Sequence, residues 1–168
     1  MNPSAIVYTS NTGTTAQYAQ MLSKQTGLPV YDLESATKQL ERNTSIVYLG
    51  WLMAGTIKGY KKANKLFSIC LVCGVGMSLA GSQIEEIRKT NNISNTIPLF
   101  TLQGGFYLEQ LHGMNKLLMT IMKKTAGKGL QEKENRTKEE EALLEILLNG
   151  GSRVSEDQVK DVVNTLLY

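Results

Sequence analysis

The sequence predicts an α/β fold, in which a doubly wound, five-stranded parallel sheet is followed by a helical C-terminal extension. Short apolar runs alternate with helical patterns over residues 5–102, the order expected when helices connect parallel strands. Several runs are apolar on both faces, as in strands that helices cover on each side. The 168-residue length and 42% hydrophobic content suit one sheet with a substantial core and exclude a disordered chain.

Five β-prone runs are expected to form the strands, at residues 5–8, 30–33, 45–49, 66–72 and 97–102. Between the first two runs, apolar residues from Ala16 to Leu22 recur at helical spacing, and Gly27 ends that helix. Before the fifth run, Ile84 and Ile87 share a helix with charged neighbours. The resulting order is βαβαβαβαβ.

The rest of the chain has the pattern of amphipathic helices. Three are expected, at residues 108–124, 138–148 and 155–167. Residues 126–137 are rich in Gly, Lys and Glu and predict an exposed connection, and Ser155 with Gln158 predicts a capping box at the last helix. We therefore expect a domain over residues 1–125 and a helical extension over 126–168 that packs on it.

The composition and the few cysteine and histidine residues indicate which cellular compartment and which binding partners to expect. The net charge is +3, no apolar stretch is long enough to cross a bilayer, and the first residues lack a secretory leader. Cys70 and Cys73 lie three apart in an expected strand, so their side chains should point to opposite faces and form no disulfide. The one histidine, His112, makes no metal-ligand cluster. We expect a cytoplasmic protein with no transmembrane segment, metal site or nucleic-acid partner.

A polar loop joins the first expected strand to the first helix. It consists of Ser10, Asn11, Thr12, Gly13, Thr14 and Thr15. In a parallel α/β sheet this position presents backbone N–H groups and a helix N-terminus to an anion, with hydroxyls as further donors. We interpret the loop as a phosphate-binding site. The alternative is a Ser/Thr-rich turn with an ordinary helix cap.

Two other nucleotide motifs are incomplete. The polar loop contains no lysine, which the Walker pattern requires. The stretch from Gly74 to Leu79 begins like a dinucleotide fingerprint, but Leu79 stands where its third glycine belongs, and the stretch follows the fourth strand. The sequence therefore disfavours a nucleoside triphosphate and a dinucleotide.

Residues 6–22, IVYTSNTGTTAQYAQML, resemble the flavodoxin signature. That signature joins a short apolar strand, a Ser/Thr-x-Thr-Gly-x-Thr phosphate loop and an Ala-containing helix, and the βα order extends the resemblance over roughly residues 4–125. The resemblance implies a flavodoxin-like sheet with strand order 2-1-3-4-5. It also implies FMN at the point between strands one and three, with its phosphate in the polar loop.

By the same resemblance, the loops after the third and fourth strands border the flavin ring. Their residues are Trp51, Leu52, Met53, Ala54, Gly55, Thr56, Cys73, Gly74, Val75, Gly76 and Met77. Flavodoxins commonly place a proline and then an aromatic residue in the first loop, where this chain has Leu52 and Ala54, with its aromatic residue at Trp51. The second loop lacks the tyrosine often found there.

The resemblance implies a flavodoxin-like electron carrier that serves redox partner proteins or a small-molecule electron acceptor, with no catalytic side chain. A looser similarity, over residues 55–57 and 102–108, is to the flavodoxin-domain family that includes the menaquinone-dependent protoporphyrinogen oxidases. It implies an alternative, an FMN-dependent oxidoreductase for a quinone, a porphyrin or a related molecule, with Phe106 and Tyr107 as core or lid residues. A third hypothesis is a flavodoxin-fold module that lacks FMN and binds a partner.

Charge is distributed unevenly along the chain. Residues 1–125 carry 12 basic and 6 acidic side chains, whereas residues 126–168 carry 6 and 9. A cluster of lysines, expected to form a solvated helix face, follows the first ring loop at Lys58, Lys61, Lys62 and Lys65. Flavodoxins are typically acidic, so an acidic carrier steered to basic reductases does not suit this chain.

Overall fold

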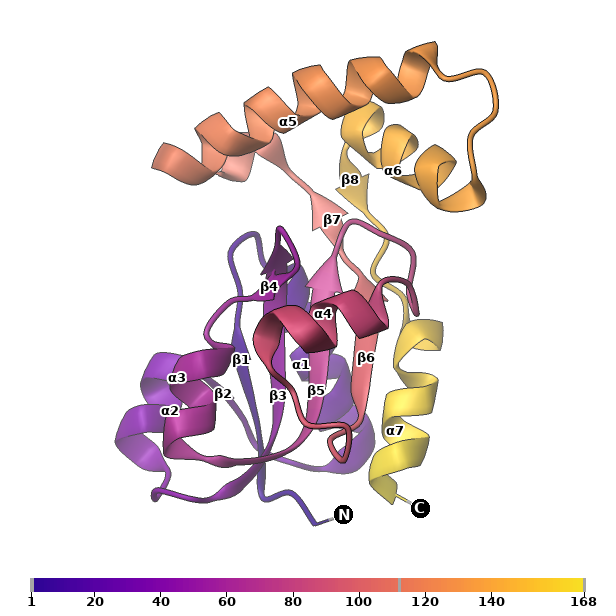
Figure 1. Cartoon of the computed structure of the whole chain (residues 1–168). Coiled ribbons are helices and arrows are strands. Elements are labelled where there is room, and N and C mark those ends of the chain that lie inside the picture. The colour runs from indigo at the N-terminus through magenta and orange to yellow at the C-terminus, as the bar shows by residue number, and fades with distance from the viewer. Residues whose placement is uncertain (1, 112, 168) are drawn as a thin grey trace.

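A parallel sheet forms the centre of the computed structural model, which describes residues 2–111 and 113–167 (Figure 1). Over these residues the parallel strands are β1 (Ala5–Thr9), β2 (Val30–Asp32), β3 (Ser45–Met53), β5 (Ser68–Gly76) and β6 (Leu99–Gln103). They pair in the order β2-β1-β3-β5-β6, and β4 (Thr56–Ile57) pairs antiparallel with the end of β3. The predicted five-stranded parallel sheet and its order are therefore confirmed.

The central strands extend further toward their carboxyl ends than the sequence predicts. β3 continues past its predicted end because Gly50 pairs with Thr9 of β1 and with Gly74 of β5. β5 runs to Gly76, and Leu66, predicted as its first residue, ends a helix instead. Residues expected in the ring loops therefore belong partly to strands.

Helices cover both faces of the sheet. The helices that pack on the sheet are α1 (Thr14–Thr26), α2 (Leu33–Gln39), α3 (Tyr60–Leu66), α4 (Ile84–Asn91), the short 3-10 helix η2 (Glu156–Val159) and α7 (Lys160–Leu167). Side chains of α2, α3 and α4 pack on one face, and those of α1, η2 and α7 pack on the other. The fold is doubly wound, as predicted.

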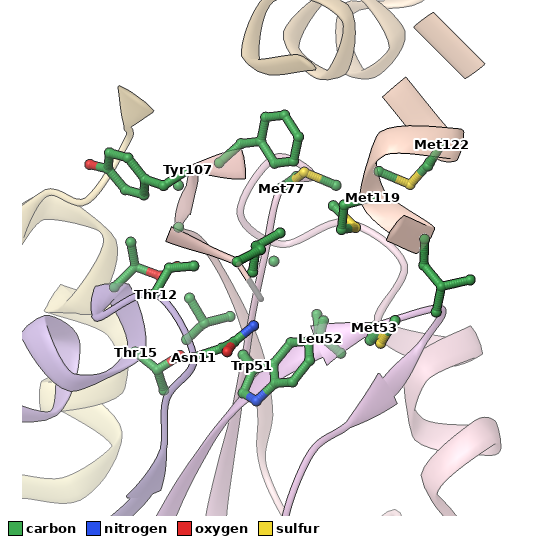
Figure 2. Close-up of a pocket in the computed structure, with 18 of the residues that line it drawn as sticks. Asn11, Thr12, Thr15, Trp51, Leu52, Met53, Met77, Tyr107, Met119 and Met122 are labelled. Atoms are coloured by element: carbon green, nitrogen blue, oxygen red, sulfur yellow. The ribbon is translucent and has the colours of Figure 1, made fainter. Parts of the chain in front are cut away.

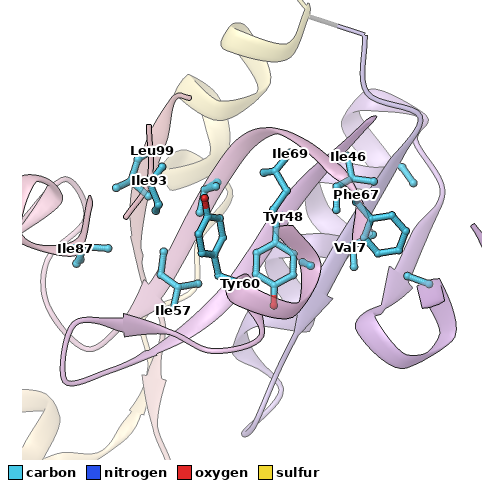
Figure 3. Packing of buried hydrophobic residues seen from close by; sticks show 14 residues of the cluster. Val7, Ile46, Tyr48, Ile57, Tyr60, Phe67, Ile69, Ile87, Ile93 and Leu99 are labelled. Atoms are coloured by element: carbon cyan, nitrogen blue, oxygen red, sulfur yellow. The ribbon is translucent and has the colours of Figure 1, made fainter. Parts of the chain in front are cut away.

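Each face of the sheet buries its own apolar cluster. Figure 3 shows the cluster under α2, α3 and α4, where the rings of Tyr48 (β3) and Tyr60 (α3) lie with centroids 6.3 Å apart. On the opposite face, Leu22 of α1 packs in one cluster with Val162 and Leu166 of α7. The C-terminal helix is consequently part of the core that α1 covers.

A helical hairpin is inserted between β6 and α7. Its elements are β7 (Gly105–Phe106), the 3-10 helix η1 (Leu108–Gln110), α5 (Gly113–Glu132), α6 (Lys138–Asn149) and β8 (Gly151–Ser152). β7 and β8 pair antiparallel, so the chain leaves and rejoins the sheet side by side. Figure 1 shows α5 and α6 beyond the carboxyl edge of the sheet. Phe106, Ile146 and Leu147 are buried there in a small cluster.

The expected division after residue 125 falls inside α5. Residues 126–132, predicted as part of an exposed connection, continue this helix. Glycine lowers helix propensity by about 1 kcal/mol relative to alanine, and this stretch contains two glycines. Leu130, however, packs in the buried cluster of the hairpin. Tertiary packing therefore overrides local propensity in the last turns of α5.

The capping box lies at a different helix from the one predicted. Thr137 Oγ1 accepts a hydrogen bond from the backbone N–H of Glu140 at 3.2 Å, and Glu140 Oε2 accepts one from the Thr137 N–H at 2.9 Å, so the box starts α6. The Ser155 side chain makes no cap hydrogen bond at η2. Gln158 instead accepts the backbone N–H of Gln103 at 2.6 Å, which ties η2 to the end of β6.

Cys70 and Cys73 pack on the same face of the sheet, so the prediction from strand alternation is wrong. The register between β3 and β5 shifts between Ile46 and Val47, which leaves Cys70 as the extra residue of β5. Cys70 therefore packs against the cluster that contains Cys73. Both thiols are free, and burial raises the pKa of each.

We predict that Leu166→Ala destabilises the protein and that Leu167→Ala does not. Leu166 is 7% exposed, so its truncation leaves a cavity in the core and should lower the free energy of unfolding by about 2–4 kcal/mol. Leu167 is 54% exposed, and its truncation should change that free energy by less than about 0.5 kcal/mol. Urea denaturation followed by circular dichroism measures both. Equally small effects would contradict the placement of α7 in the core.

Candidate functional site

A cavity of about 320 Å³ lies at the carboxyl edge of the sheet and reaches α5 (Figure 2). Predicted site residues that line it are Asn11, Thr12, Thr14, Thr15, Trp51, Leu52, Met53, Ala54, Val75, Gly76 and Met77. Ser10 and Gly13 face an open hollow beside the same polar loop. The remaining predicted residues lie outside both linings, namely Gly55, Thr56, Cys73 and Gly74.

The polar loop leaves the start of α1 without a side-chain cap. Gly13 occupies the N-cap position with φ 89°, in the left-handed region that favours glycine, and its N–H donates to Ser10 Oγ at 3.2 Å. Thr14 is the first residue of α1. The first N–H groups of a helix have no intrahelical acceptor and carry its positive dipole end. The loop therefore directs an uncapped helix N-terminus to the cavity edge.

The hydroxyl of Thr15 is buried without a hydrogen-bond partner among the described residues. Thr15 is only 1% exposed, so water does not solvate its side chain. An unpaired buried polar group costs about 1–3 kcal/mol, and such groups are rare in native proteins. Thr15 lines the cavity together with Thr12 and Thr14, so an anion bound there could supply the missing acceptor.

The hollow on the other side of the loop contains an acidic residue that is already engaged. Asp32 lines this hollow of about 670 Å³ together with Glu34 and Lys62. Its carboxylate caps α2 by accepting the N–H groups of Glu34 and Ser35 and the Ser35 hydroxyl. The bonds from Ser35 lower the pKa of Asp32. Asp32 is thus an ionised helix cap and no candidate acid.

The first predicted ring loop is a β-hairpin. Ala54 and Gly55 form its two-residue turn, with φ 47° and 73°, between β3 and β4. Trp51, Leu52 and Met53 precede the turn in β3 and line the floor of the cavity (Figure 2). Gly55, which the resemblance places beside the ring, is the second residue of this turn and lies outside the cavity lining.

Asn91 of α4 fixes this hairpin in place. Its Oδ1 accepts the backbone N–H of Ile57 at 2.8 Å, and its Nδ2 donates to the carbonyl of Gly55 at 2.8 Å and to that of Ile87 at 2.7 Å. Asn91 is buried, so each of these bonds replaces a lost bond to water. No sequence pattern marked this residue, because two of its three partners lie in β4 and in the turn before it.

Tyr48 anchors the base of the same hairpin. Its hydroxyl donates to the carbonyl of Lys58 at 2.7 Å, so in the 2.8 Å bond between Thr9 Oγ1 and Tyr48 Oη the threonine is the donor. Gly59 has φ 81°, and a Cβ there would collide with both hydroxyls. Burial raises the pKa of Tyr48 to about 12. The phenol is therefore neutral and structural.

The second predicted ring segment is the end of β5. Val75, Gly76 and Met77 reach the cavity, whereas Cys73 is buried in the core. A Cβ added to Gly74 or Gly76 would lie 3.1 Å from Leu52 Cδ1. These glycines hence make room for the Leu52 side chain of the neighbouring strand.

The structure adds a wall and a roof that the sequence did not assign to the site. They are formed by Gly104, Gly105, Phe106, Tyr107, Leu111, Leu118, Met119 and Met122. A Cβ at Gly104 would lie 2.9 Å from Val75 Cγ1 and 3.0 Å from Thr14 Oγ1, so any side chain there would push on both neighbours. Of this set the sequence pointed to Phe106 and Tyr107 alone. The methionine-rich pattern of α5 was the available signal for the roof.

Charged and metal-binding groups play little part in the cavity. Lys58 Nζ lies 5.7 Å from the centroid of the Trp51 ring, a cation–π contact at the edge of the site. Among the described residues, no group of three His, Cys, Asp or Glu side chains could hold a metal ion. His112 lies outside the described residues.

Comparison with known proteins identifies no relative. No family model matches the chain, and no curated protein or solved structure matches it significantly.

We predict that Asn91→Ala releases the hairpin. Loss of the amide leaves the Ile57 N–H and the Gly55 carbonyl unpaired, so the free energy of unfolding should fall by about 2–4 kcal/mol. Hydrogen exchange should show faster exchange of the Ile57 amide than in the native protein. Asn64→Ala, at an exposed position of α3, is the matched control and should change neither quantity. Unaltered protection of the Ile57 amide in the Asn91 variant would show that Asn91 does not hold the hairpin in place.

Proposed function

We propose that this protein binds FMN noncovalently in the cavity and transfers electrons through it. The observation that carries the proposal is the buried, unpaired hydroxyl of Thr15 beside an uncapped helix N-terminus. A phosphate group accepts hydrogen bonds from such donors and is stabilised by the positive end of the helix dipole. The rest of the cavity supports a ligand whose other end is flat and apolar.

The residues present fit the two ends of FMN. Donors of the polar loop, from Ser10 to Thr15, would hold the phosphate, and Trp51 and Met77 would border the ring. When bound, FMN supplies reversible uptake of one or two electrons. The protein's part would be to position that group and to limit its contact with water, which an apolar lining favours.

The lining favours electron transfer over acid–base chemistry. None of the described residues that line the cavity is Asp, Glu, His, Lys, Arg or Cys. Tyr107 is their one titratable member. An electron carrier needs no proton-transferring side chain, whereas general acid–base catalysis requires one within hydrogen-bond reach of the reacting atoms.

The roof supports a second candidate function, an FMN-dependent oxidoreductase that acts directly on a quinone, a porphyrin or a similar small molecule. Leu118, Met119 and Met122 of α5 line the cavity opposite the strand ends. A carrier that exposes only a flavin edge to a protein partner does not require such a roof. Flexible methionine and leucine side chains suit a flat apolar substrate.

FMN titration of the purified protein tests the main proposal. Quenching of flavin fluorescence should report saturable binding at micromolar concentration or below. We predict that Thr15→Val weakens this binding about tenfold or more, because valine keeps the shape of threonine and removes the donor. The same substitution should leave the free energy of unfolding unchanged or slightly higher, since an unpaired buried hydroxyl is lost.

Thr26→Val, at the opposite end of α1, is the matched control. It should leave FMN affinity unaltered. Absence of any FMN binding at micromolar concentration would overturn both redox functions and leave the module that binds a partner without FMN. Equal FMN affinity in the native protein and the Thr15 variant would show that the polar loop does not bind FMN.

A variant of the roof separates the carrier from the oxidoreductase. We predict that Met119→Trp, which narrows the space under the roof, slows reoxidation of the reduced protein by a soluble quinone about tenfold while FMN remains bound. Electron transfer to a protein acceptor such as cytochrome c should keep its rate. Leu117→Trp, on the exposed side of the same helix, should alter neither rate. Equal quinone rates in both variants would favour the carrier.

A further inference from the structure

α5 carries an exposed apolar strip on a different side of the helix from the residues that pack in the hairpin's buried cluster. We define the strip as Met114, Leu117, Leu118 and Ile121, whose exposed fractions lie between 43% and 68%. Their spacing places them along one side of the helix, whereas Met119 and Met122 pack in the hairpin cluster from another side. Contiguous exposed apolar side chains on a protein surface commonly mark an interaction site.

Lysines continue the strip along the same helix. Lys124 lies one turn beyond Ile121, Lys128 lies one turn further, and both are exposed. α5 contains four lysines in all and one glutamate. Exposed apolar side chains with lysines beside them suit the surface of an anionic bilayer, where both can make favourable contacts.

The position of α5 suits a planar surface. Figure 1 shows α5 as the outermost element beyond the carboxyl edge of the sheet, with its axis running across the strand direction. Its full length is thus presented to one side of the molecule. Among the described residues, no helix is both long and apolar enough to cross a membrane. Contact with a bilayer would therefore be contact with its surface.

We propose that the α5 strip docks on an anionic lipid surface. The apolar side chains would enter the boundary between headgroups and acyl chains, and Lys124 and Lys128 would contact anionic headgroups. A stable protein partner needs about 800 Å² of surface on each side, which four side chains of one convex helix do not provide.

Docking would bring the cavity to the lipid. Leu118 belongs to the strip and also lines the cavity. The surface interaction itself is independent of FMN, so its failure and a failure of FMN binding are separate results.

Co-sedimentation of the full chain with vesicles tests the proposal. Binding to vesicles of phosphatidylcholine with phosphatidylglycerol should be clear, should weaken as salt is added, and should be much weaker for phosphatidylcholine alone. Lys124→Gln with Lys128→Gln should weaken binding about 25-fold, since each lysine near an anionic surface contributes about fivefold. Leu117→Gln with Ile121→Gln should weaken it by about tenfold or more.

Matched controls use exposed residues of the same kinds elsewhere. Lys61→Gln with Lys65→Gln on α3, and Leu148→Gln with Leu167→Gln outside the strip, should keep vesicle binding. FMN affinity and circular dichroism spectra should be unaltered in the strip and lysine variants. No binding to anionic vesicles, or equal losses in the controls, would overturn the proposal. A second outcome would also overturn it: sedimentation velocity shows a dimer, and the strip variants dissociate this dimer but leave vesicle binding unchanged.

Discussion

The parallel register of the central strands is the constraint that brings the sheet side of the candidate site together. Thr9 of β1 pairs with Gly50 of β3, and Gly50 pairs with Gly74 of β5. Parallel strands in register end at one edge of the sheet, so the segments that follow them meet there. The polar loop, the hairpin at the end of β3 and the end of β5 are neighbours for this reason, although they lie far apart in the sequence.

The sheet and the polar loop could be predicted because their signals are local. Apolar runs mark the strands, and the hydroxyl-rich stretch from Ser10 to Thr15 directly precedes a helix. The rest of the site depends on contacts between distant segments. Asn91 has no distinguishing sequence context, and only folding brings its amide to Gly55 and Ile57. Met119 likewise belongs to a helical pattern that suits either packing on α6 or covering a cavity.

The cavity divides into a polar end and an apolar end. Threonine hydroxyls and a helix N-terminus form the first, while tryptophan, methionine and leucine side chains form most of the second. α5 contributes to both the interior and the surface, because Met119 and Met122 face inward and Leu117 and Ile121 face solvent. A displacement of this one helix would therefore alter the roof of the cavity and the outer surface together.

The two-stranded ribbon under the hairpin has an evolutionary consequence. Gly105 pairs with Ser152 and Phe106 pairs with Gly151, so the chain enters and leaves the hairpin through adjacent strands, about 4.8 Å apart. A tight turn is enough to join such ends, and connections of very different length cost similar amounts of closure entropy. The hairpin is thus a self-contained insertion that joins the sheet through two adjacent strands. A lineage can lengthen, shorten or exchange it while the sheet, its core and the polar loop stay as they are.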